Sequence, residues 1–358
     1  MAASYKAVLW NRQKRIYDLT VMGFVTGYIT LFVVLTMYFN PTVTQETLII
    51  RSTATLAIIM LHVILVIGPL CRLQPAFLPL LYNRRHLGVI LFIVAAVHGV
   101  FSILHFHSLG NINPVLSVFL SNTHYPSMAR FPFQPLGFFA LIILFFMAVT
   151  SHDFWLHNLG PRLWKILHMM VYLAYALILF HVMLGVVQYE TSPVVSFLLG
   201  AGLVTVVTLH VVAALKERRL DIPSGQEISG SYVSACNLDE IKNNRARLIC
   251  LGNERIAIFR YGNRLSAVSN VCKHQNGPLG EGRIIDGCIT CPWHGYQYLP
   301  HNGCSPPPFK EKVATFDVRV VNNEVWVNPA PYPEGTERPP AIIPLQNCHH
   351  EKDIHDRR

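Results

Sequence analysis

The chain has 358 residues, of which 52% are hydrophobic and 14% charged, whereas soluble globular proteins carry about 25% charged residues. This composition argues against a single soluble domain. Residues 1–215 contain 11 of the 29 Lys and Arg and 4 of the 20 Asp and Glu, which predicts a membrane part followed by a soluble part. The net charge of +9 is concentrated beside the apolar segments. That pattern suits anionic lipid headgroups and excludes nucleic acid as the expected partner.

Six apolar runs reach the length of about 20 residues that crosses a bilayer core of roughly 30 Å. They predict an α-helical membrane bundle of six transmembrane helices. Basic residues precede the first run and no small-residue cleavage site follows it, so we expect a retained helix and not a signal peptide. The runs are 19–39, 47–70, 86–107, 134–150, 166–188 and 193–215.

The charged connections predict the orientation. Basic residues gather in alternate loops, and such loops face the cytoplasm. Both termini and the soluble part are therefore expected on the cytoplasmic side of the cell (inner) membrane, in a multi-pass protein. The long outer connection, 108–133, contains an apolar stretch at 115–120 that we expect to be a short helix. The basic residues are Arg72, Arg84, Arg85, Arg162, Lys165, Lys216, Arg218 and Arg219.

Histidines are unusually frequent in the membrane part, which holds 11 of the 17, and ionisable groups there usually mark function. His98 lies in the outer part of the third run, and His168 and His181 lie in the inner and outer parts of the fifth. Thirteen residues at a 1.5 Å rise separate His168 from His181 by about 20 Å, which suits two stacked b-type haems held by imidazoles. An ideal helix would leave these two rings about 140° apart, so the helix must be interrupted or the haems approached from different sides. Covalent haem attachment is not expected, because the chain has no C-x-x-C-H.

The motifs around these histidines resemble the ferric-reductase-like transmembrane superfamily. They are RRHLG at 84–88, AVH at 96–98, LGPRLW at 159–164 and LH at 167–168, followed by His181. The haem-binding membrane subunit of bacterial periplasmic methionine sulfoxide reductase is similar. The resemblance implies that His98 and His181 share an outer haem and that His168 ligates an inner one. Relatives such as the NADPH oxidases carry a histidine in place of Arg84, so the second inner ligand stays open among Arg84, His86 and His62.

The soluble part begins after Arg219 with short alternating apolar runs separated by Gly and Asn turns, which predict an all-β domain. Its runs are 247–251, 255–261, 265–269, 314–321 and 324–327. We therefore divide the chain into a cytoplasmic N-terminus (1–18), a membrane domain (19–215), a β domain (216–328) and a tail (329–358). The proline-rich and charged tail is expected to be disordered or to bind a partner.

Two short motifs lie between these strands. Cys272 and His274 form a C-x-H motif, and Cys291 and His294 form C-x-x-H after sixteen intervening residues. Such loops can hold a [2Fe-2S] cluster with both cysteines on one iron and both histidines on the other. Zinc could use the same donors, but C-x-H is too short for the usual finger spacing. The pattern resembles the Rieske family.

Neighbouring positions carry information about the potential of this cluster. Rieske proteins of quinol-oxidising cytochrome complexes have one extra cysteine in each loop, and Gly277 and Trp293 stand there in this chain. Tyr296 replaces their serine, which removes a hydroxyl hydrogen bond to sulfur, while Tyr298 remains as a donor. Fewer hydrogen bonds predict a potential at the low end of roughly −150 to +300 mV. In this the domain resembles dioxygenase-type Rieske ferredoxins.

These features predict a transmembrane electron-transfer subunit. Because the soluble part has no G-x-G-x-x-G unit, a separate cytoplasmic reductase, ferredoxin or membrane quinol must donate the electrons, and a periplasmic redox protein is the expected acceptor. The chain is thus expected to be an oxidoreductase component and not a self-sufficient enzyme. The alternative is a terminal reductase of metal ions, oxygen or quinone at the outer haem. A Rieske oxygenase is disfavoured, because the 64 residues after His294 lack a set of ligands for mononuclear iron.

Overall fold

The computed structural model describes residues 12–344 of the chain apart from short gaps. The chain divides into two compact units, a helical unit within Ala7–Glu217 and a β unit within Arg218–Arg358, and each is described by itself. The gaps lie at 78–79, 81–82, 121–126, 128–129, 152, 190–192, 221–226, 229–231, 252–253, 275–276 and 293–294.

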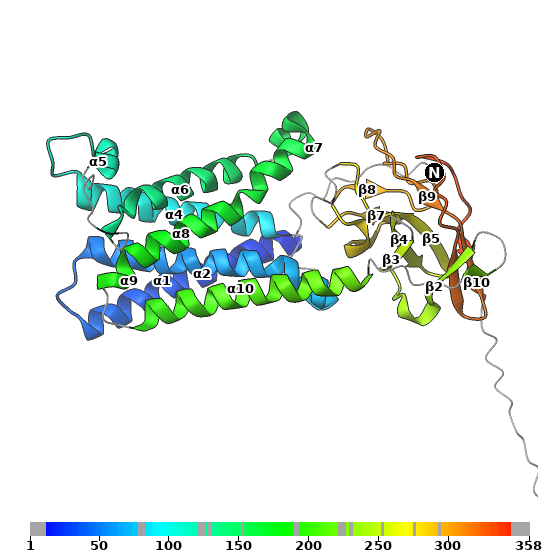
Figure 1. Ribbon diagram of the computed structural model, residues 1–358, viewed down its shortest axis with the longest axis horizontal. Coiled ribbons are helices and arrows are strands. Elements are labelled where there is room, and N and C mark those ends of the chain that lie inside the picture. Colours follow the sequence, from blue (N-terminus) through cyan, green and yellow to red (C-terminus); the bar gives the residue numbers. More distant parts are fainter. Residues whose placement is uncertain are drawn as a thin grey trace, which may run out of the picture. The chain divides into compact units, whose positions relative to one another are not determined.

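The helical unit is a bundle of long helices that run side by side (Figure 1). Within it α2 packs mainly on α4, and α6 packs on α8. The side-chain oxygen of Thr44 caps α2 by accepting a hydrogen bond from the Thr47 amide at 3.3 Å. The helices are α1 (Arg12–Phe39), α2 (Gln45–Leu73), η1 (Pro75–Phe77), α4 (Arg84–His107), α5 (Pro114–Leu120), α6 (Gln134–Val149), α7 (Asp153–Met169), α8 (Val171–Leu184), α9 (Val186–Tyr189) and α10 (Pro193–Leu220).

Five segments of the described chain are long and apolar enough to cross a membrane. Five of the six predicted runs correspond to them, and the run at 134–150 forms the shorter apolar helix α6. With 16 residues, α6 is about 24 Å long. The predicted helical membrane bundle is therefore confirmed, with one helix shorter than a bilayer core. The five segments are Arg15–Phe39, Gln45–Leu73, Arg84–His107, Leu163–Tyr189 and Pro193–Lys216.

The helix boundaries around the fifth predicted run differ from the sequence-based expectation. Helix α7 begins at Asp153, well before the predicted start at residue 166, because its first turns mix aromatic and leucine side chains with polar and charged ones and so form no continuous apolar run. It ends at Met169, and α8 begins at Val171. The helix is thus interrupted between His168 and His181. An interruption is one of the two ways in which both rings could serve stacked haems despite the angle of about 140° that an ideal helix would leave between them. The short helix expected at 115–120 is α5.

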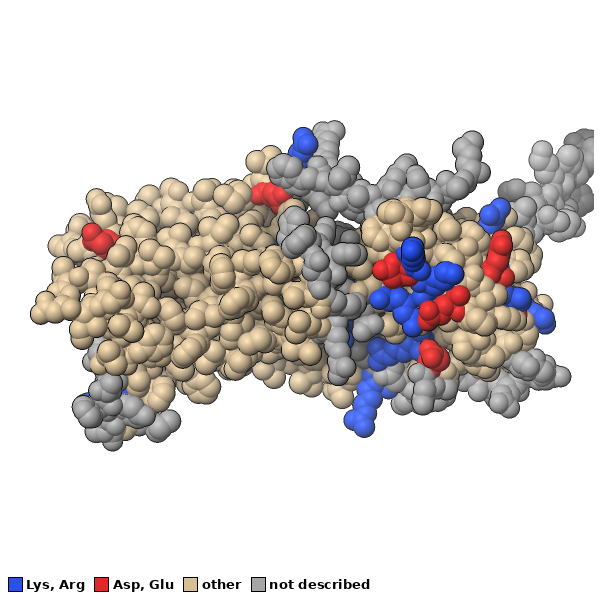
Figure 2. All heavy atoms as spheres, turned by 90° about the horizontal axis from the view of Figure 1, so that it is seen from above, with Lys and Arg blue, Asp and Glu red and all other residues tan. Residues whose placement is uncertain are grey.

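The surface of the helical unit is almost free of charge on the face shown in Figure 2, whereas the β unit carries both signs. Many of the largest apolar side chains of the helical unit are exposed, among them Leu19 (73%), Phe24 (75%) and Phe197 (75%). An apolar surface of this extent indicates contact with lipid. The helical unit is therefore the membrane part of a multi-pass membrane protein.

The β unit contains three antiparallel sheets, as the alternating runs predicted. The first has the strand order β1-β2-β11-β10, the second β12-β5-β4-β3 with β9 also paired to β5, and the third β6-β7-β8. The strands are β1 (Glu227–Ile228), β2 (Tyr232–Asn237), β3 (Ala246–Leu251), β4 (Glu254–Tyr261), β5 (Arg264–Ser269), β6 (Arg283–Ile285), β7 (Cys288–Thr290), β8 (Gln297–Tyr298), β9 (Thr315–Phe316), β10 (Val318–Val321), β11 (Glu324–Val327) and β12 (Ala341–Ile342).

Two-residue turns fix the register of two hairpins. Asp286 and Gly287 join β6 to β7 with φ values of 50° and 78°, and Asn322 and Asn323 join β10 to β11 with 49° and 65°. A positive φ at both central positions matches the right-handed twist of paired strands, and Asp, Asn and Gly tolerate it best. The Asp286-Gly287 turn aligns Ile285 with Cys288, and β7 leads directly into the second ligand loop.

The described part of the tail has hydrogen-bonded contacts with the β unit. Residues 329–344, called the strap below, cross the β unit itself, whereas the expectation that the tail binds a partner stays a prediction. Strand β12 pairs with β5, and the amide of Ile343 donates to the carbonyl of Asn263 at 2.8 Å. The sequence suggested disorder because the strap is rich in proline and charge, yet its hydrogen bonds come from the domain that it crosses.

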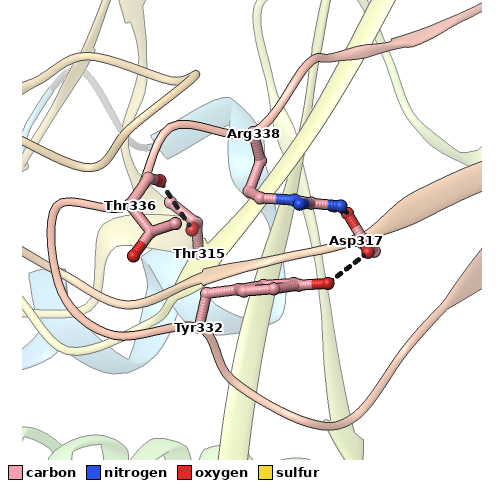
Figure 3. Close-up of polar contacts among 5 residues, drawn as sticks. All are labelled: Thr315, Asp317, Tyr332, Thr336 and Arg338. Carbon is pink, nitrogen blue, oxygen red and sulfur yellow. Dashed lines mark hydrogen bonds and ion pairs between the residues drawn. The ribbon is translucent and has the colours of Figure 1, made fainter.

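A polar cluster fastens the strap (Figure 3). The Arg338 guanidinium lies over the Tyr332 ring, 4.2 Å from its centroid, and donates from Nε to Asp317 Oδ1 at 2.7 Å. The Tyr332 hydroxyl donates to Asp317 Oδ2, also at 2.7 Å. The Thr315 hydroxyl donates to the carbonyl of Thr336 at 3.1 Å. Asp317 is therefore the acceptor that holds both strap side chains.

We expect Asp317→Asn to lower the free energy of unfolding by about 1 kcal/mol, the low end for hydrogen bonds to charged groups, because Arg338 remains accessible to water. Burial pushes the pKa of the Asp317 carboxyl upward, but hydrogen bonds from Arg338 and Tyr332 hold it below its ordinary value of 3.8. The stabilisation is thus complete above pH 3.8 and is lost as the pH falls through the lower folded value. Thermal denaturation at several pH values, with Glu254→Gln as a surface control, measures this. Equal stability of the Asn variant would contradict it.

Candidate cluster and haem sites

Two loops of the β unit bring the predicted cluster ligands together. Cys272 follows β5, and its amide donates to the carbonyl of Gly277 at 2.9 Å. Cys291 follows β7, and its amide donates to the carbonyl of Tyr296 at 2.7 Å. Each loop is therefore closed on its own cysteine. Both cysteines are 1% exposed and belong to one buried cluster of side chains.

Tyr298 connects the two loops from β8. It is completely buried, and its hydroxyl lies 3.4 Å from Cys272 Sγ. Burial raises the pKa of this hydroxyl, and the neighbouring Cys272 and Cys291 raise it further. The hydroxyl thus keeps its proton and can donate it to a thiolate. This is the donor role that the sequence left to Tyr298.

His274 lies against Tyr296. The two rings are stacked with centroids 4.3 Å apart and an angle of 9°, and Tyr296 is 2% exposed. The Tyr296 hydroxyl donates to Glu311 Oε2. The fourth expected ligand, His294, and the neighbouring Trp293 lie outside the described residues.

The donors that are described fit a [2Fe-2S] cluster. Two buried thiols and the His274 imidazole are three of the four ligands of such a cluster, and a hydroxyl near sulfur can tune its potential. Gly277 contributes its carbonyl to the loop. Gly280 and Gly282 follow in the same segment and have structural roles. The Gly280 amide donates to Asn270 Oδ1 at 2.7 Å, and a Cβ at Gly282 would lie 2.2 Å from the carbonyl oxygen of Thr290.

In the helical unit, His98 of α4 and His181 of α8 face each other with ring centroids 6.4 Å apart. Two metal–imidazole bonds of about 2.0–2.1 Å each, together with the ring radii, span such a distance. His98 and His181 would therefore be the two imidazoles that hold one haem iron, if a haem is bound here. Gly137 of α6 makes room for them, because a Cβ there would lie 2.7 Å from His181 Nδ1.

The hydrogen bonds of three histidines fix which ring nitrogen can bind a metal. His98 Nδ1 lies 3.1 Å from the carbonyl of Ile50, His181 Nδ1 2.8 Å from that of Phe133, and His168 Nδ1 3.0 Å from that of Trp164. A carbonyl only accepts, so each Nδ1 carries the proton and each Nε2 keeps its lone pair. This is the tautomer that an axial haem ligand needs.

His168 lies at the other end of the bundle, where the basic residues gather. Lys216 Nζ of α10 donates to the carbonyl of Arg72 at 2.9 Å, and Arg84 is close enough to His168 to act on it electrostatically. His168 Nε2 is buried and has no hydrogen-bond partner within the described chain. A buried nitrogen with a lone pair and no donor fits a metal ligand.

The other inner-ligand candidates differ in what they can offer a metal. His62 Nε2 pairs with the Tyr175 hydroxyl at 3.0 Å, so this nitrogen is engaged. His86 Nδ1 pairs with Asp18 at 2.7 Å, which leaves its Nε2 with a lone pair. The Arg84 guanidinium stays protonated in proteins and has no lone pair to offer a metal. The structure thus brings His98 and His181 together and keeps His86 as a candidate for the second inner ligand.

Three contacts near these sites were not predicted from the sequence. The Trp164 ring stacks on His168 with centroids 3.7 Å apart, which the i, i+4 spacing could have indicated. Glu311 contacts Tyr296, and Glu334 of the strap pairs with Lys273 beside Cys272 at 2.6 Å. Neither of the latter had a signal, since both join residues far apart in the sequence.

Comparison with known proteins agrees with both units. Residues 53–179 match the ferric reductase like transmembrane component, and residues 231–317 match the Rieske [2Fe-2S] domain. The ferredoxin subunit of anthranilate 1,2-dioxygenase from Burkholderia cepacia is 33% identical over 92 residues, which are 25% of this chain and 85% of that protein. The chain belongs to the Rieske [2Fe-2S] family and joins its domain to a ferric-reductase-like membrane domain.

Further Rieske proteins are similar over shorter shares of their length. Methylxanthine N1-demethylase from Pseudomonas putida is 30% identical over 83 residues, which are 21% of this chain and 24% of that protein. Among solved structures, the ferredoxin of carbazole 1,9a-dioxygenase from Nocardioides aromaticivorans IC177 is 25% identical, covering 28% of this chain and 100% of that one with a TM-score of 0.27. The match of residues 231–317 to the Rieske domain supports a [2Fe-2S] cluster.

We expect Tyr298→Phe to lower the midpoint potential of the Rieske cluster. Removal of a hydroxyl that donates to Cys272 leaves more charge on the sulfur and disfavours the added electron. A redox titration followed by electron paramagnetic resonance (EPR) measures the shift. The Phe variant retains the ring, so its cluster content should equal that of the parent. A raised or unchanged potential would contradict the assigned donor role.

Proposed function

We propose that this membrane protein carries electrons between a cytoplasmic-side Rieske cluster and two b-type haems. The observation that carries the proposal is the arrangement of His98, His181 and His168. These residues lie at two depths of one bundle, and the bonds from each Nδ1 to a backbone carbonyl leave each Nε2 with its lone pair, which supports ligation. The cluster and the haems supply one-electron redox centres when bound.

The outer haem is assigned to His98 and His181. The centroid distance of 6.4 Å supports a shared iron, and Phe133 and Ile50 hold the two rings through their carbonyls. Because α4 and α8 each contribute one ligand, the haem would lie between these helices. The protein's part is to present two neutral imidazoles in an apolar slot.

The inner haem is assigned to His168. Arg84 is better suited to pair with a haem propionate than to ligate iron, because a guanidinium is a fixed cation that matches a carboxylate. Gly88, one turn after Arg84, has no atom within 4 Å of an added Cβ, so this face of α4 is open to a flat macrocycle. Removal of Arg84 should therefore weaken haem retention without removing an axial ligand.

The proposed direction runs from the cytoplasm to the periplasm. The basic residues at the His168 end favour a cytoplasmic position for that end. A ferredoxin-type Rieske domain is a one-electron carrier in the dioxygenase relative, and the chain has no nicotinamide-binding motif of its own. A separate cytoplasmic reductase, ferredoxin or membrane quinol is thus the proposed donor, and a periplasmic redox protein is the proposed acceptor.

Spectroscopy of the purified full-length protein tests the proposal. We expect b-type haem absorbance, a Rieske EPR signal in the reduced state and a ratio of two haems to one cluster per chain. A cluster potential well above that of both haems would reverse the proposed direction. A colourless protein, or one with zinc bound in place of iron, would refute the function.

A further inference from the structure

Glu311 lies next to the proposed cluster although it is not a ligand. It belongs to the segment that follows Phe309, and Phe309 packs edge-on against Tyr296 with ring centroids 5.1 Å apart. Oε2 of Glu311 accepts from the Tyr296 hydroxyl and from the Lys310 amide at 3.1 Å. Two donors therefore hold this carboxylate in one place.

Tyr296 connects Glu311 to the cluster ligand. Its ring lies parallel to that of His274 on one side, and its hydroxyl points to Glu311 on the other. Glu311 is also close enough to His274 for a direct electrostatic interaction. Burial pushes the pKa of the Glu311 carboxyl upward, but the bonds from Tyr296 and backbone amides hold it below its ordinary value. The carboxylate is thus charged at neutral pH.

A fixed negative charge beside the cluster acts on its reduction. With two thiolate and two neutral imidazole ligands, the oxidised cluster has no net charge, and the reduced cluster carries one negative charge. A neighbouring carboxylate repels the added electron, most strongly where water is excluded. A serine in place of Tyr296 would instead donate a hydrogen bond to sulfur and stabilise that electron.

We propose that Glu311 is a positioning and potential-setting residue for the Rieske cluster, acting through Tyr296 to fix the His274 ring and through its charge to disfavour reduction. The inference rests on the proposed cluster. It assigns a role to a residue outside both ligand motifs and explains why Tyr296 directs its hydroxyl away from the sulfurs. The low potential expected of this domain then has a source besides the missing hydrogen bond.

The test is an EPR-monitored redox titration of the full-length Glu311→Gln protein. Gln removes the charge but can still accept from Tyr296, so the potential should rise. At a fixed ambient potential near the midpoint, the ratio of reduced to oxidised cluster should increase by roughly threefold to tenfold. Glu324→Gln, at the exposed first position of strand β11, is the matched control and should leave the ratio unchanged.

Glu311→Asp separates charge from shape, because it keeps the carboxylate and shortens its reach. A potential close to that of the parent supports the charge role, whereas a rise equal to that of the Gln variant overturns it. An intact EPR signal with an unchanged potential in Glu311→Gln also overturns the inference, and so does loss of the cluster from that variant, since Glu311 would then serve loading. If the parent protein shows no Rieske signal, the proposed cluster itself fails.

Discussion

Replacing His181 with Ala should remove one haem per chain and leave the Rieske signal unchanged. His181 and His98 face each other across the proposed outer site, and a haem with a single imidazole loses half of its protein ligation. His98→Ala should therefore cause the same loss, and the double variant should lose no more than either single variant. The pyridine haemochrome assay gives the haem content, and EPR gives the cluster.

His62→Gln is the control for this experiment. His62 is also a buried histidine of the bundle, but its Nε2 is engaged by the Tyr175 hydroxyl, and its ring packs on Gly202 of α10. Gln can keep the hydrogen bond, so we expect full haem content. If His181→Ala retains all of its haem, or if His62→Gln loses as much as His181→Ala does, the outer-site assignment is wrong.

The β unit shows which features local sequence determines. The C-x-H and C-x-x-H motifs place ligands only two or three residues apart, so loop geometry alone holds each pair together. The Asp286-Gly287 and Asn322-Asn323 turns are equally local, because their positive φ values select the residues directly. For these features the sequence contained nearly all the information. The predicted apolar runs of the β unit likewise lie within a few residues of observed strands.

Features that depend on distant segments could not be read in this way. The carbonyls of Ile50 and Phe133 select the tautomers of His98 and His181, yet no side chain marks a carbonyl for this role. The strap reads as disordered because its composition is polar, whereas Asp317 and β5 supply its partners. Glu311 likewise gains its role only when its loop closes over Tyr296.

The inner site combines both situations. The sequence predicted His168 as an inner ligand, but its possible partners could be told apart only by the pairing of His62 Nε2 with Tyr175 and of His86 Nδ1 with Asp18. These pairs are the polar contacts between helices that make a lone helical histidine ambiguous in sequence. In our proposal Arg84 is a cation beside the inner haem, because a guanidinium has no lone pair for a metal.

Replacing Cys291 with Ser should remove the Rieske cluster and leave both haems in place. Cys291 is buried in the second loop, and a serine hydroxyl keeps its proton at neutral pH where a thiolate would bind iron. Iron content should fall to the level of the haem iron, and both the acid-labile sulfide and the Rieske EPR signal should vanish. Electrons from a cytoplasmic donor that enter through the cluster would then no longer reduce the haems, although dithionite would.

Cys288→Ser is the matched control, because Cys288 lies three residues earlier and is equally buried in β7. Burial raises the pKa of its thiol, with a further contribution from Asp286, so Cys288 stays protonated and is not expected to bind iron. Its variant should keep the cluster even if it unfolds at a lower temperature. A Cys291→Ser protein with a full Rieske signal would remove Cys291 from the ligand set. Haem reduction by the cytoplasmic donor at the parent rate, in a protein without the cluster, would show that electrons enter the membrane domain by another route.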